Sequence, residues 1–495
     1  MTLGNAAERL QLVVSLALSG RHDEAEAVAR EIRDKAIAGE AWLALFRINA
    51  NLQRLESARE ALDRALETTP GSPALRLERA LLLEAMGRAA ESLAALEELA
   101  REDTDSPMLL VHLARALEFA GRDGEARAVL ERGLARWPAD PALHRQFALA
   151  CWRAGEAGMQ RLEQAIAAHP AELPLRLVAA ELLRNAGDAA RALTLLEGAA
   201  RYAPGAPVIA SAIGVVLDDL DRSAEALPYL RAAAKTAHNP APVERNLAAV
   251  LLRTGEPAEA LGIVDALLAR TPDDQQLLAY RATALRLLGA AAYHALHDYA
   301  RLVRAYRPAP PPGFPDVAAF NAAFADTLTR LHRGRQRPLA QSLRGGTQTD
   351  RNLPADEPHV AAFFAMIDAP IRDYIAQLGV PGHPTDRRRS PDYRIAGSWS
   401  VQLAPGGYHT DHVHPQGWIS SAYYVELPAE DGSGSRAGWL RFGEPGLRIA
   451  GCAADHFVRP EPGMLVLFPS YLWHGTVPFH EGGRRLTAAF DVVPA

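Results

Sequence analysis

The chain has very little lysine. Among its 495 residues only Lys35 and Lys235 are lysines, so residues 291–495 contain none. A carboxylate buried in that part of the chain must therefore be held by arginine or by uncharged hydrogen-bond donors. Any binding site for an acid there is expected to use arginine.

Cysteine and long apolar runs are also scarce. Cys151 and Cys452 are the only cysteines, which is too few for a disulfide framework and favours a reducing cytoplasm. No apolar run approaches the ~20 residues that span a membrane. The apolar stretch 10–18 follows Glu8 and Arg9, so it fits a first repeat helix better than a signal peptide. We expect a cytoplasmic protein that does not contact a membrane.

An excess of basic residues is absent as well. Residues 291–495 contain 20 arginines against 19 acidic residues, and the rest of the chain has 33 basic against 40 acidic residues. Neither part has the positive surplus that binding of nucleic acid requires. The length of 495 residues indicates more than one domain. No nucleic-acid partner is expected.

What the first 290 residues do contain is an internal repeat, which must be sought before any local pattern. A small residue recurs at intervals of 33, 34, 34, 66, 34 and 34 residues, at Ala25, Ala58, Ser92, Ala126, Ala192, Ala226 and Ala260. Prolines keep the same phase where each second helix should end, at Pro70, Pro138, Pro170, Pro204 and Pro272. Glycines mark the turns between paired helices, at Gly20, Gly87, Gly121, Gly187 and Gly255. This is the tetratricopeptide period, with one slightly shortened pair inside the interval of 66.

Residues 1–289 are therefore predicted to form an all-α tetratricopeptide superhelix. About eight helix pairs should stack, because one pair cannot bury its apolar face alone. By resemblance to other tetratricopeptide arrays, the concave face would bind an extended peptide or another protein. The alternative is that the array only spaces or dimerises the rest of the chain.

Proline and helical periodicity divide the rest of the chain. Residues 290–315 are predicted to contain a helix and a stiff, proline-rich linker. Residues 316–392 read as a helical buttress, and residues 393–495 as a β-rich core. We expect residues 316–495 to fold around their own core, so a chain that starts near Pro308 should stay soluble. Insolubility would instead indicate that the last repeat helices belong to the buttress.

The segment between positions 406 and 485 contains residues that can bind a metal. Side chains two positions apart on a strand point to the same face, so His412 and His414 (the His-x-His pair) can reach one ion. His474, which follows an apolar strand and a turn, is well placed as a third ligand. Neutral imidazole suits iron, zinc, copper or nickel. Three ligands with open positions are typical of non-haem iron oxygenases, although the usual set is two histidines and one carboxylate.

An arginine follows the third histidine by eleven residues. Arg485 and Thr487 share one strand face, whereas Arg484 points the other way. A guanidinium binds a carboxylate with two hydrogen bonds, and a neighbouring hydroxyl adds one more. Arg485 and Thr487 are therefore predicted to bind an acid. The alternative is a surface salt bridge, which Arg484 is better placed to make.

Together these motifs resemble those of bacterial 2-oxoglutarate/iron(II) oxygenases with a His-x-His-Pro and Ser-Gly-x-Tyr-Tyr signature. The motifs that carry the resemblance stand at 341–349, 397–401, 412–415, 418–425, 468–470, 474 and 485–487. The resemblance implies a double-stranded β-helix, or jelly-roll, fold. It also implies that His412, His414 and His474 hold iron, and that Arg485 with Thr487 binds the C5 carboxylate of 2-oxoglutarate.

A second set of ligands stays open in the same segment. His409 and Asp411 form a His-x-Asp pair that would complete a triad of two histidines and one carboxylate with His474. In an unbroken strand this pair points away from the His-x-His pair, so the two pairs cannot serve together. We favour the His-x-His pair, because Pro415 and the motifs after it align with that register.

The first cupin sequence motif is a glycine, five residues and His-x-His. The segment that begins at Gly406 also fits this motif. The glutamate expected after three or four intervening residues beyond the second histidine is missing, because Trp418 and Ile419 stand there. The sequence is thus interpreted as a repeat array fused to an iron(II)- and 2-oxoglutarate-dependent dioxygenase that hydroxylates a recruited peptide or protein. The competing hypotheses are a non-catalytic adaptor with a structural or metal-binding barrel, and a cupin-type metalloenzyme that does not use 2-oxoglutarate.

Overall fold

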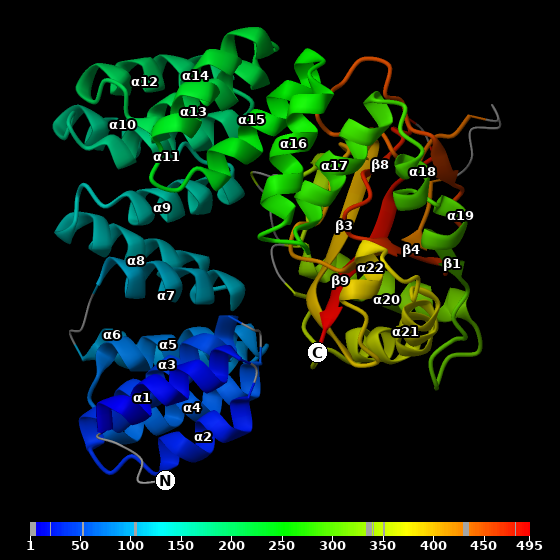
Figure 1. Ribbon diagram of the computed structural model, residues 1–495. Coiled ribbons are helices and arrows are strands. Elements are labelled where there is room, and N and C mark those ends of the chain that lie inside the picture. Colours follow the sequence, from blue (N-terminus) through cyan, green and yellow to red (C-terminus); the bar gives the residue numbers. More distant parts are fainter. Residues whose placement is uncertain are drawn as a thin grey trace. The chain divides into compact units, whose positions relative to one another are not determined.

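The structure is a computed structural model (Figure 1). It describes residues 6–19, 21–51, 54–102, 106–332, 339, 341–349, 352–428, 435–480 and 482–495. The chain divides into two compact units, Met1–Ala150 and Cys151–Pro494.

The first unit is a stack of antiparallel helix pairs (Figure 1). Its helices are α1 (Ala6–Leu18), α2 (His22–Arg30), α3 (Lys35–Asn51), α4 (Leu55–Thr68), α5 (Pro73–Ala85), α6 (Ala89–Arg101), α7 (Pro107–Phe119) and α8 (Asp123–Arg136). The repeated small residues of this unit lie on the second helices and are at most 1% exposed: Ala25, Ala58, Ser92 and Ala126. A larger side chain at these positions would not fit between closely packed helices.

The second unit continues the same pattern. Its repeat helices are α9 (Pro141–Ala154), α10 (Met159–Ala168), α11 (Leu173–Ala186), α12 (Ala189–Tyr202), α13 (Pro207–Asp219), α14 (Ser223–Thr236), α15 (Ala241–Thr254), α16 (Pro257–Leu268) and α17 (Gln275–Leu287). The shortened pair is α9–α10, because α10 has only 10 residues. The predicted tetratricopeptide array is confirmed.

The turn glycines have the conformation that their positions require. Gly87, Gly121, Gly187 and Gly255 all have φ between 75° and 97°, a left-handed region that suits glycine after a helix. Gly20 lies outside the described residues.

Two antiparallel sheets form the rest of the second unit. Their strands are β1 (Arg304–Tyr306), β2 (Leu343–Gln348), β3 (Tyr393–His409), β4 (Ile419–Glu426), β5 (Leu440–Phe442), β6 (His456–Val458), β7 (Leu465–Pro469), β8 (His474–Thr476) and β9 (Arg485–Pro494). The larger sheet has the order β1-β7-β4-β9-β3-β2, and the smaller one β6-β5-β8. The predicted sequence of folds, an all-α array followed by an α+β double-stranded β-helix domain, is confirmed.

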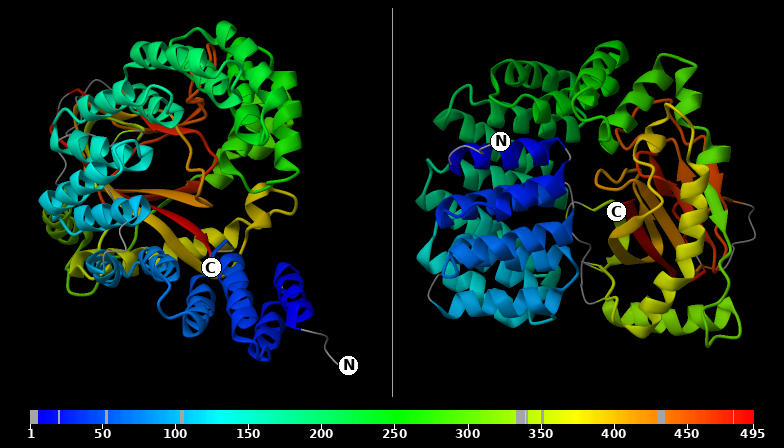
Figure 2. Two further views of the ribbon diagram at one scale, coloured as in Figure 1. Left: turned by 90° about the vertical axis from the view of Figure 1, so that its left-hand side faces the viewer. Right: turned by 60° about the horizontal axis from the view of Figure 1, so that its bottom comes forward.

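Helices cover one face of the larger sheet (Figures 1 and 2). The remaining helices are α18 (Ala292–Leu296), α19 (Tyr299–Leu302), α20 (Val317–Leu331), α21 (Pro358–Gln377) and α22 (Pro384–Arg387). Phe363 of α21 packs against Tyr423 of β4, with ring centroids 5.2 Å apart, and against Phe490 of β9 at 6.1 Å. Because side chains alternate along a strand, Tyr424 and the odd-numbered residues of β9 face the other way, towards the smaller sheet.

The segment around Gly345 and Gly346 is a strand rather than the ordered loop that two adjacent glycines suggest. It pairs with β3 as the edge strand β2, with a bulge between Arg344 and Gly346. Gly345 has φ 66°, and a side chain at Gly346 would collide with the backbone carbonyl of Gln402. Glycine therefore permits the bulge at one position and close strand pairing at the other.

The last repeat helices contact the β-rich part directly. The indole Nε1 of Trp473 donates to the Thr283 hydroxyl of α17 at 3.0 Å, and the Tyr471 hydroxyl donates to the Leu296 carbonyl of α18 at 2.6 Å. The strand β1, which precedes the proline-rich segment, pairs with β7. The predicted boundaries at 289, 315 and 392 stay predictions, but these contacts favour a buttress that includes the last repeat helices.

We therefore expect a chain that starts near Pro308 to be insoluble or strongly destabilised. It would lack the partners of Trp473 and Tyr471 and would expose their buried rings, and burial of one such side chain contributes about 1.5–3 kcal/mol. A matched chain that starts at Pro257 keeps α16 to β1. Soluble expression and thermal unfolding of the two would test this, and equal stability would restore the linker as a domain boundary.

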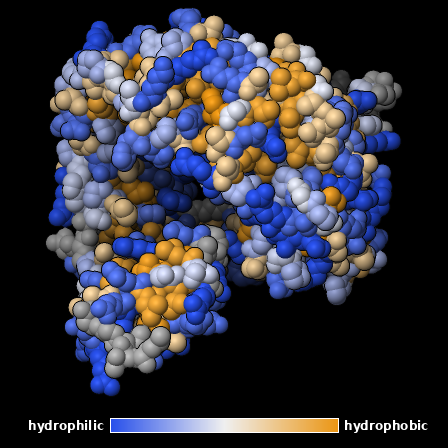
Figure 3. All heavy atoms as spheres, in the orientation of Figure 1, coloured by the Kyte–Doolittle hydropathy of each residue, from blue (hydrophilic) through white to orange (hydrophobic). Residues whose placement is uncertain are grey.

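Among the described residues, no helix is both long enough and apolar enough to cross a membrane. Figure 3 shows hydrophilic side chains over most of the visible face, with hydrophobic patches between them. Cys151 and Cys452 are both buried.

Candidate metal centre

Three histidine side chains converge on the side of the larger sheet that faces the smaller one. One nitrogen from each of His412, His414 and His474 lies within 4.8 Å of the others. The Nε2 atoms of His412 and His414 are 3.2 Å apart. Two imidazole nitrogens bound to one metal at about 2.1 Å, with an angle of about 90–110° between them, would be about 3.0–3.4 Å apart. The observed separation therefore fits two ligands of one ion.

The backbone that holds these rings differs from the predicted strand. β3 ends at His409, and the residues after it form only an isolated bridge between His412 and His474. The His412 amide donates to the His474 carbonyl at 2.9 Å, the reverse bond is 3.1 Å, and the His414 amide donates to the Ser470 carbonyl at 3.0 Å. Directly opposed residues of an antiparallel bridge project to the same side, so the bridge places His412 beside His474.

Hydrogen bonds at the far side of each ring prepare the Nε2 atoms for a metal. The Nδ1 atoms lie 2.8 Å from the Thr410 carbonyl for His412, 2.7 Å from the Asp491 carboxylate for His414, and 2.9 Å from the Leu472 carbonyl for His474. Each acceptor favours the tautomer with a proton on Nδ1. The lone pairs of the three Nε2 atoms are then free, so the donor set fits a metal that binds imidazole.

Burial favours the neutral form of His412 and His474, which is the form that binds a metal. Burial lowers the pKa of His412 to about 3 and the pKa of His474 well below its ordinary value. The neighbouring histidines lower both pKa values further. Proton competition for these two ligands is therefore weak near pH 7.

The alternative pair of ligands has other partners. Asp411 binds Arg441 through both carboxylate oxygens, one of them at 3.0 Å from Nε, and burial raises the pKa of Asp411 to about 6. The Nδ1 atom of His409 lies 2.9 Å from the Ser342 hydroxyl. Among the described residues, the one group of three side chains with converging ligand atoms contains neither His409 nor Asp411.

The strand β9 carries a buried cation, Arg485, near the histidines. Arg485 is 3% exposed, and its guanidinium carbon lies 5.1 Å from the ring centroid of Tyr424. No carboxylate in the described part of the chain pairs with Arg485, and its Nε and the Tyr424 hydroxyl are buried without a hydrogen-bond partner. Burial lowers the pKa of Arg485 and raises that of Tyr424. Thr487, 4% exposed, follows on the same strand face.

His409 connects this cation to the histidine cluster. Its ring centroid is 5.6 Å from that of His412. Burial, then His412 and Arg485, lower the pKa of His409 well below its ordinary value. His409 therefore contacts the ring of His412 and lies within electrostatic range of Arg485. Arg484 points away and binds Glu426 at 2.5 Å, as strand alternation predicted.

Sequence reasoning missed two residues of this site. Asp491 lies six positions after Arg485 on the same strand, and an even spacing places both on one face. This even spacing is a sequence signal from which Asp491 could have been predicted. Tyr424 belongs to the Tyr-Tyr motif that was recognised, but which of the two tyrosines faces inward depends on the register between β4 and β9.

Comparison with family models agrees with the division into repeats and a β-rich domain. Residues 397–491 match the family described as "Putative 2OG-Fe(II) oxygenase", and residues 39–82 and 107–150 match the tetratricopeptide repeat. The chain therefore combines tetratricopeptide repeats with a domain of the 2-oxoglutarate/iron(II) oxygenase type, as its motifs predicted.

Solved structures resemble each part separately. A prolyl-4-hydroxylase from Pseudomonas putida is 20% identical over 40% of this chain and 97% of its own, with a TM-score of 0.28. Yeast Tom70 is 14% identical over 60% of this chain and 68% of its own, with a TM-score of 0.45. A tetratricopeptide repeat protein from Parabacteroides merdae is 13% identical over 50% and 98%, with a TM-score of 0.35. Values this low indicate neither function nor ligand. The comparison with curated proteins returns no match.

Proposed function

We propose that the protein is an iron(II)- and 2-oxoglutarate-dependent dioxygenase of the cytoplasm that hydroxylates a peptide or protein. In this proposal His412, His414 and His474 hold the iron, and Arg485 with Thr487 binds the distal carboxylate of 2-oxoglutarate. The match of residues 397–491 to an oxygenase family supports the reaction class. The converging Nε2 atoms support the metal ligands.

The observation that carries the proposal is the unpaired, buried guanidinium of Arg485. A charge removed from water without a partner destabilises a fold by several kcal/mol. Arg485 has no acidic partner among the described residues and is 3% exposed. Such an arrangement is expected where a ligand brings the negative charge. A dicarboxylate supplies one acid group to Arg485 and leaves the other for the metal.

The roles of the chain's own groups follow from their positions. Iron with 2-oxoglutarate and oxygen supplies oxidative decarboxylation to succinate and carbon dioxide, coupled to hydroxylation of a C–H bond. Arg485 would grip the distal carboxylate bidentately, and the Tyr424 and Thr487 hydroxyls can each donate one hydrogen bond. Apolar groups near the histidines, including Phe468, whose ring centroid lies 4.6 Å from that of His474, exclude water. The low local dielectric strengthens each of these contacts.

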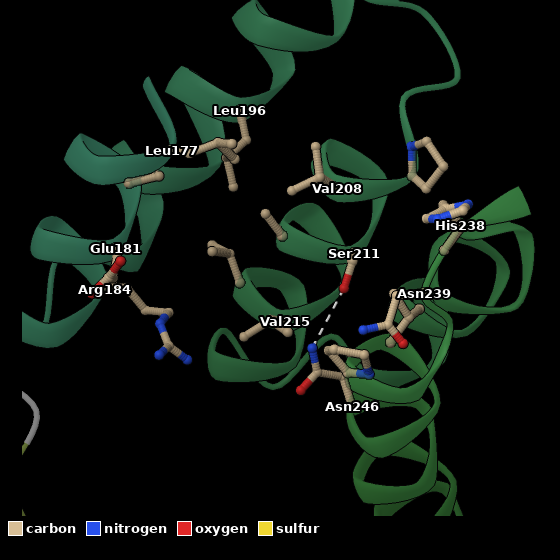
Figure 4. A pocket seen from close by; sticks show the side chains of 17 residues that line it. Leu177, Glu181, Arg184, Leu196, Val208, Ser211, Val215, His238, Asn239 and Asn246 are labelled. Atoms are coloured by element: carbon tan, nitrogen blue, oxygen red, sulfur yellow. Dashed lines mark hydrogen bonds between the residues drawn. The ribbon is translucent and has the colours of Figure 1, made fainter. Parts of the chain in front are cut away.

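A cavity in the repeats of the second unit supports recruitment of a peptide or protein. It has a volume of 610 Å³ and is formed mainly by α11, α13 and α15, the first helices of three successive pairs. Figure 4 shows the apolar side chains of Leu177, Val208 and Val215 around it, with Asn246 hydrogen-bonded to Ser211 at 3.4 Å. Apolar walls with a few polar groups suit a short segment of extended chain.

Turnover of 2-oxoglutarate tests this function. Iron-loaded protein with 2-oxoglutarate and oxygen should release succinate slowly alone and faster when cell extract supplies the substrate. Desalted protein without added iron is the control. Metal binding without any 2-oxoglutarate binding would favour a cupin-type metalloenzyme or a non-catalytic adaptor with a metal-binding barrel. No binding of either would favour a non-catalytic adaptor.

A further inference from the structure

Asp491 is a buried carboxylate that has no arginine partner among the residues that the structure describes. It is 9% exposed, and its oxygens lie 2.7 and 2.9 Å from the Nδ1 atom of His414. The Ser420 hydroxyl donates to the same carboxylate at 2.7 Å. Among the described residues His414 is the one side chain that forms an ion pair with Asp491. The Asp411 carboxylate, whose side chain is 6% exposed, pairs instead with Arg441.

The structure makes room for this carboxylate and its serine partner. The Ser420 hydroxyl lies 2.8 Å from the Ser470 hydroxyl. A side chain at Gly417 would collide with Ser470 and come within 3.3 Å of the Asp491 carboxyl carbon. Glycine at position 417 therefore lets the loop that follows the His-x-His pair close over the network without displacing Ser470.

The three histidines differ in what holds them. His412 and His474 give their Nδ1 protons to backbone carbonyls, whereas His414 faces a full negative charge. All three candidate ligands are imidazoles, so the set lacks the carboxylate that usually reduces the charge of a metal bound by a facial triad. A carboxylate bonded to the distal nitrogen of a ligating histidine fixes its tautomer and raises its donor strength.

We propose that Asp491 is a positioning residue that supplies the missing negative charge to the metal through His414, supported by Ser420. The inference rests on the proposed metal site. Asp491 and Arg485 lie on one face of β9, and in this proposal each is neutralised by a bound group of opposite charge. The carboxylate lacks a cation, which the metal provides through His414, and the guanidinium lacks an anion, which the cosubstrate provides.

The test compares Asp491→Asn with wild type in the full chain, with Fe(II) alone as the probe. The amide has the same size but no charge. We expect Fe(II) affinity, measured by competition with a chelating dye, to fall roughly 10–100-fold. A negative charge stabilises Fe(III) more than Fe(II), so its removal should raise the midpoint potential of the bound iron. The rise is about 59 mV for each tenfold decrease in the ratio of Fe(III) affinity to Fe(II) affinity. A purely structural role would leave the potential unchanged.

Adjacent serines on β4 give a matched control. Ser420→Ala removes a donor to Asp491. Ser421→Ala removes an equally buried hydroxyl, which bonds to the Phe490 backbone at 2.8 Å on the opposite face. We expect Ser420→Ala to weaken Fe(II) binding and to change the potential, because the carboxylate loses the hydroxyl that holds it against His414, and Ser421→Ala to change neither. This pair decides the matter if Asp491→Asn does not fold.

The outcomes separate this inference from the proposed function. If wild type binds Fe(II) and 2-oxoglutarate but Asp491→Asn and Ser420→Ala match it in affinity and potential, the role of Asp491 is overturned and the function stands. If the variants behave as expected but wild type does not bind 2-oxoglutarate, the function fails and the role of Asp491 stands. If wild type does not bind Fe(II), both fail.

Discussion

Replacement of Arg485 by alanine should reduce the affinity for 2-oxoglutarate by roughly 30-fold to several thousand-fold. Removal of one partner from a buried, hydrogen-bonded charge pair costs about 2–5 kcal/mol, and each 1.4 kcal/mol corresponds to about tenfold in affinity. No lysine can replace the lost charge, because residues 291–495 contain none. Titration of 2-oxoglutarate into the anaerobic iron complex measures the loss directly.

Iron binding should survive in Arg485→Ala, because the arginine is not among the converging ligands. Arg484→Ala is the matched control, since this neighbour binds Glu426 on the other strand face and should leave 2-oxoglutarate affinity nearly unchanged. Equal binding by wild type and Arg485→Ala, or no binding by wild type, would remove Arg485 from the cosubstrate site.

The same titration distinguishes the contribution of Tyr424. Its hydroxyl is buried without a partner, and Tyr424→Phe removes only that hydroxyl. A neutral hydrogen bond contributes about 0.5–1.5 kcal/mol, so we expect a loss of roughly 2- to 13-fold, well below that of Arg485→Ala. A loss as large as that of Arg485→Ala would indicate that the tyrosine, rather than the arginine, dominates recognition.

The repeat array could be predicted because its information is local and periodic. A small residue, a turn glycine and a terminal proline recur along the array, and where the structure describes them they lie at buried, left-handed and helix-ending positions. The contacts of α17 and α18 with the β-rich part could not be predicted. Trp473 and Thr283 are 190 residues apart in the sequence. The periodic pattern predicts the helices of a repeat but not which of their surfaces contacts a distant element.

The candidate site could be predicted in part for the same reason. The spacing of His412, His414 and His474 marked a metal site even though the first two do not lie in a regular strand. Asp491 was missed, because its contact with His414 depends on how the loop after β3 folds back towards β9. A shift of one residue in strand pairing would turn Asp491 and Arg485 to the opposite face. The amino-acid sequence alone does not determine that register.

The ligand set is decided by three single replacements. His474→Ala and His414→Ala each remove one of three converging nitrogens, so each should lower Fe(II) affinity by more than ~100-fold, because even loss of an outer hydrogen-bond partner costs 10–100-fold. Asp411→Asn should keep most of the binding. Arg441 retains Glu444 as a partner at 3.2 Å, which limits the damage to the fold. Fe(II) stoichiometry and affinity of the full chain would measure all three. Loss of binding in Asp411→Asn with retention in His414→Ala would transfer the site to His409, Asp411 and His474, and the bond between Asp411 and Arg441 would then have to open when the metal binds.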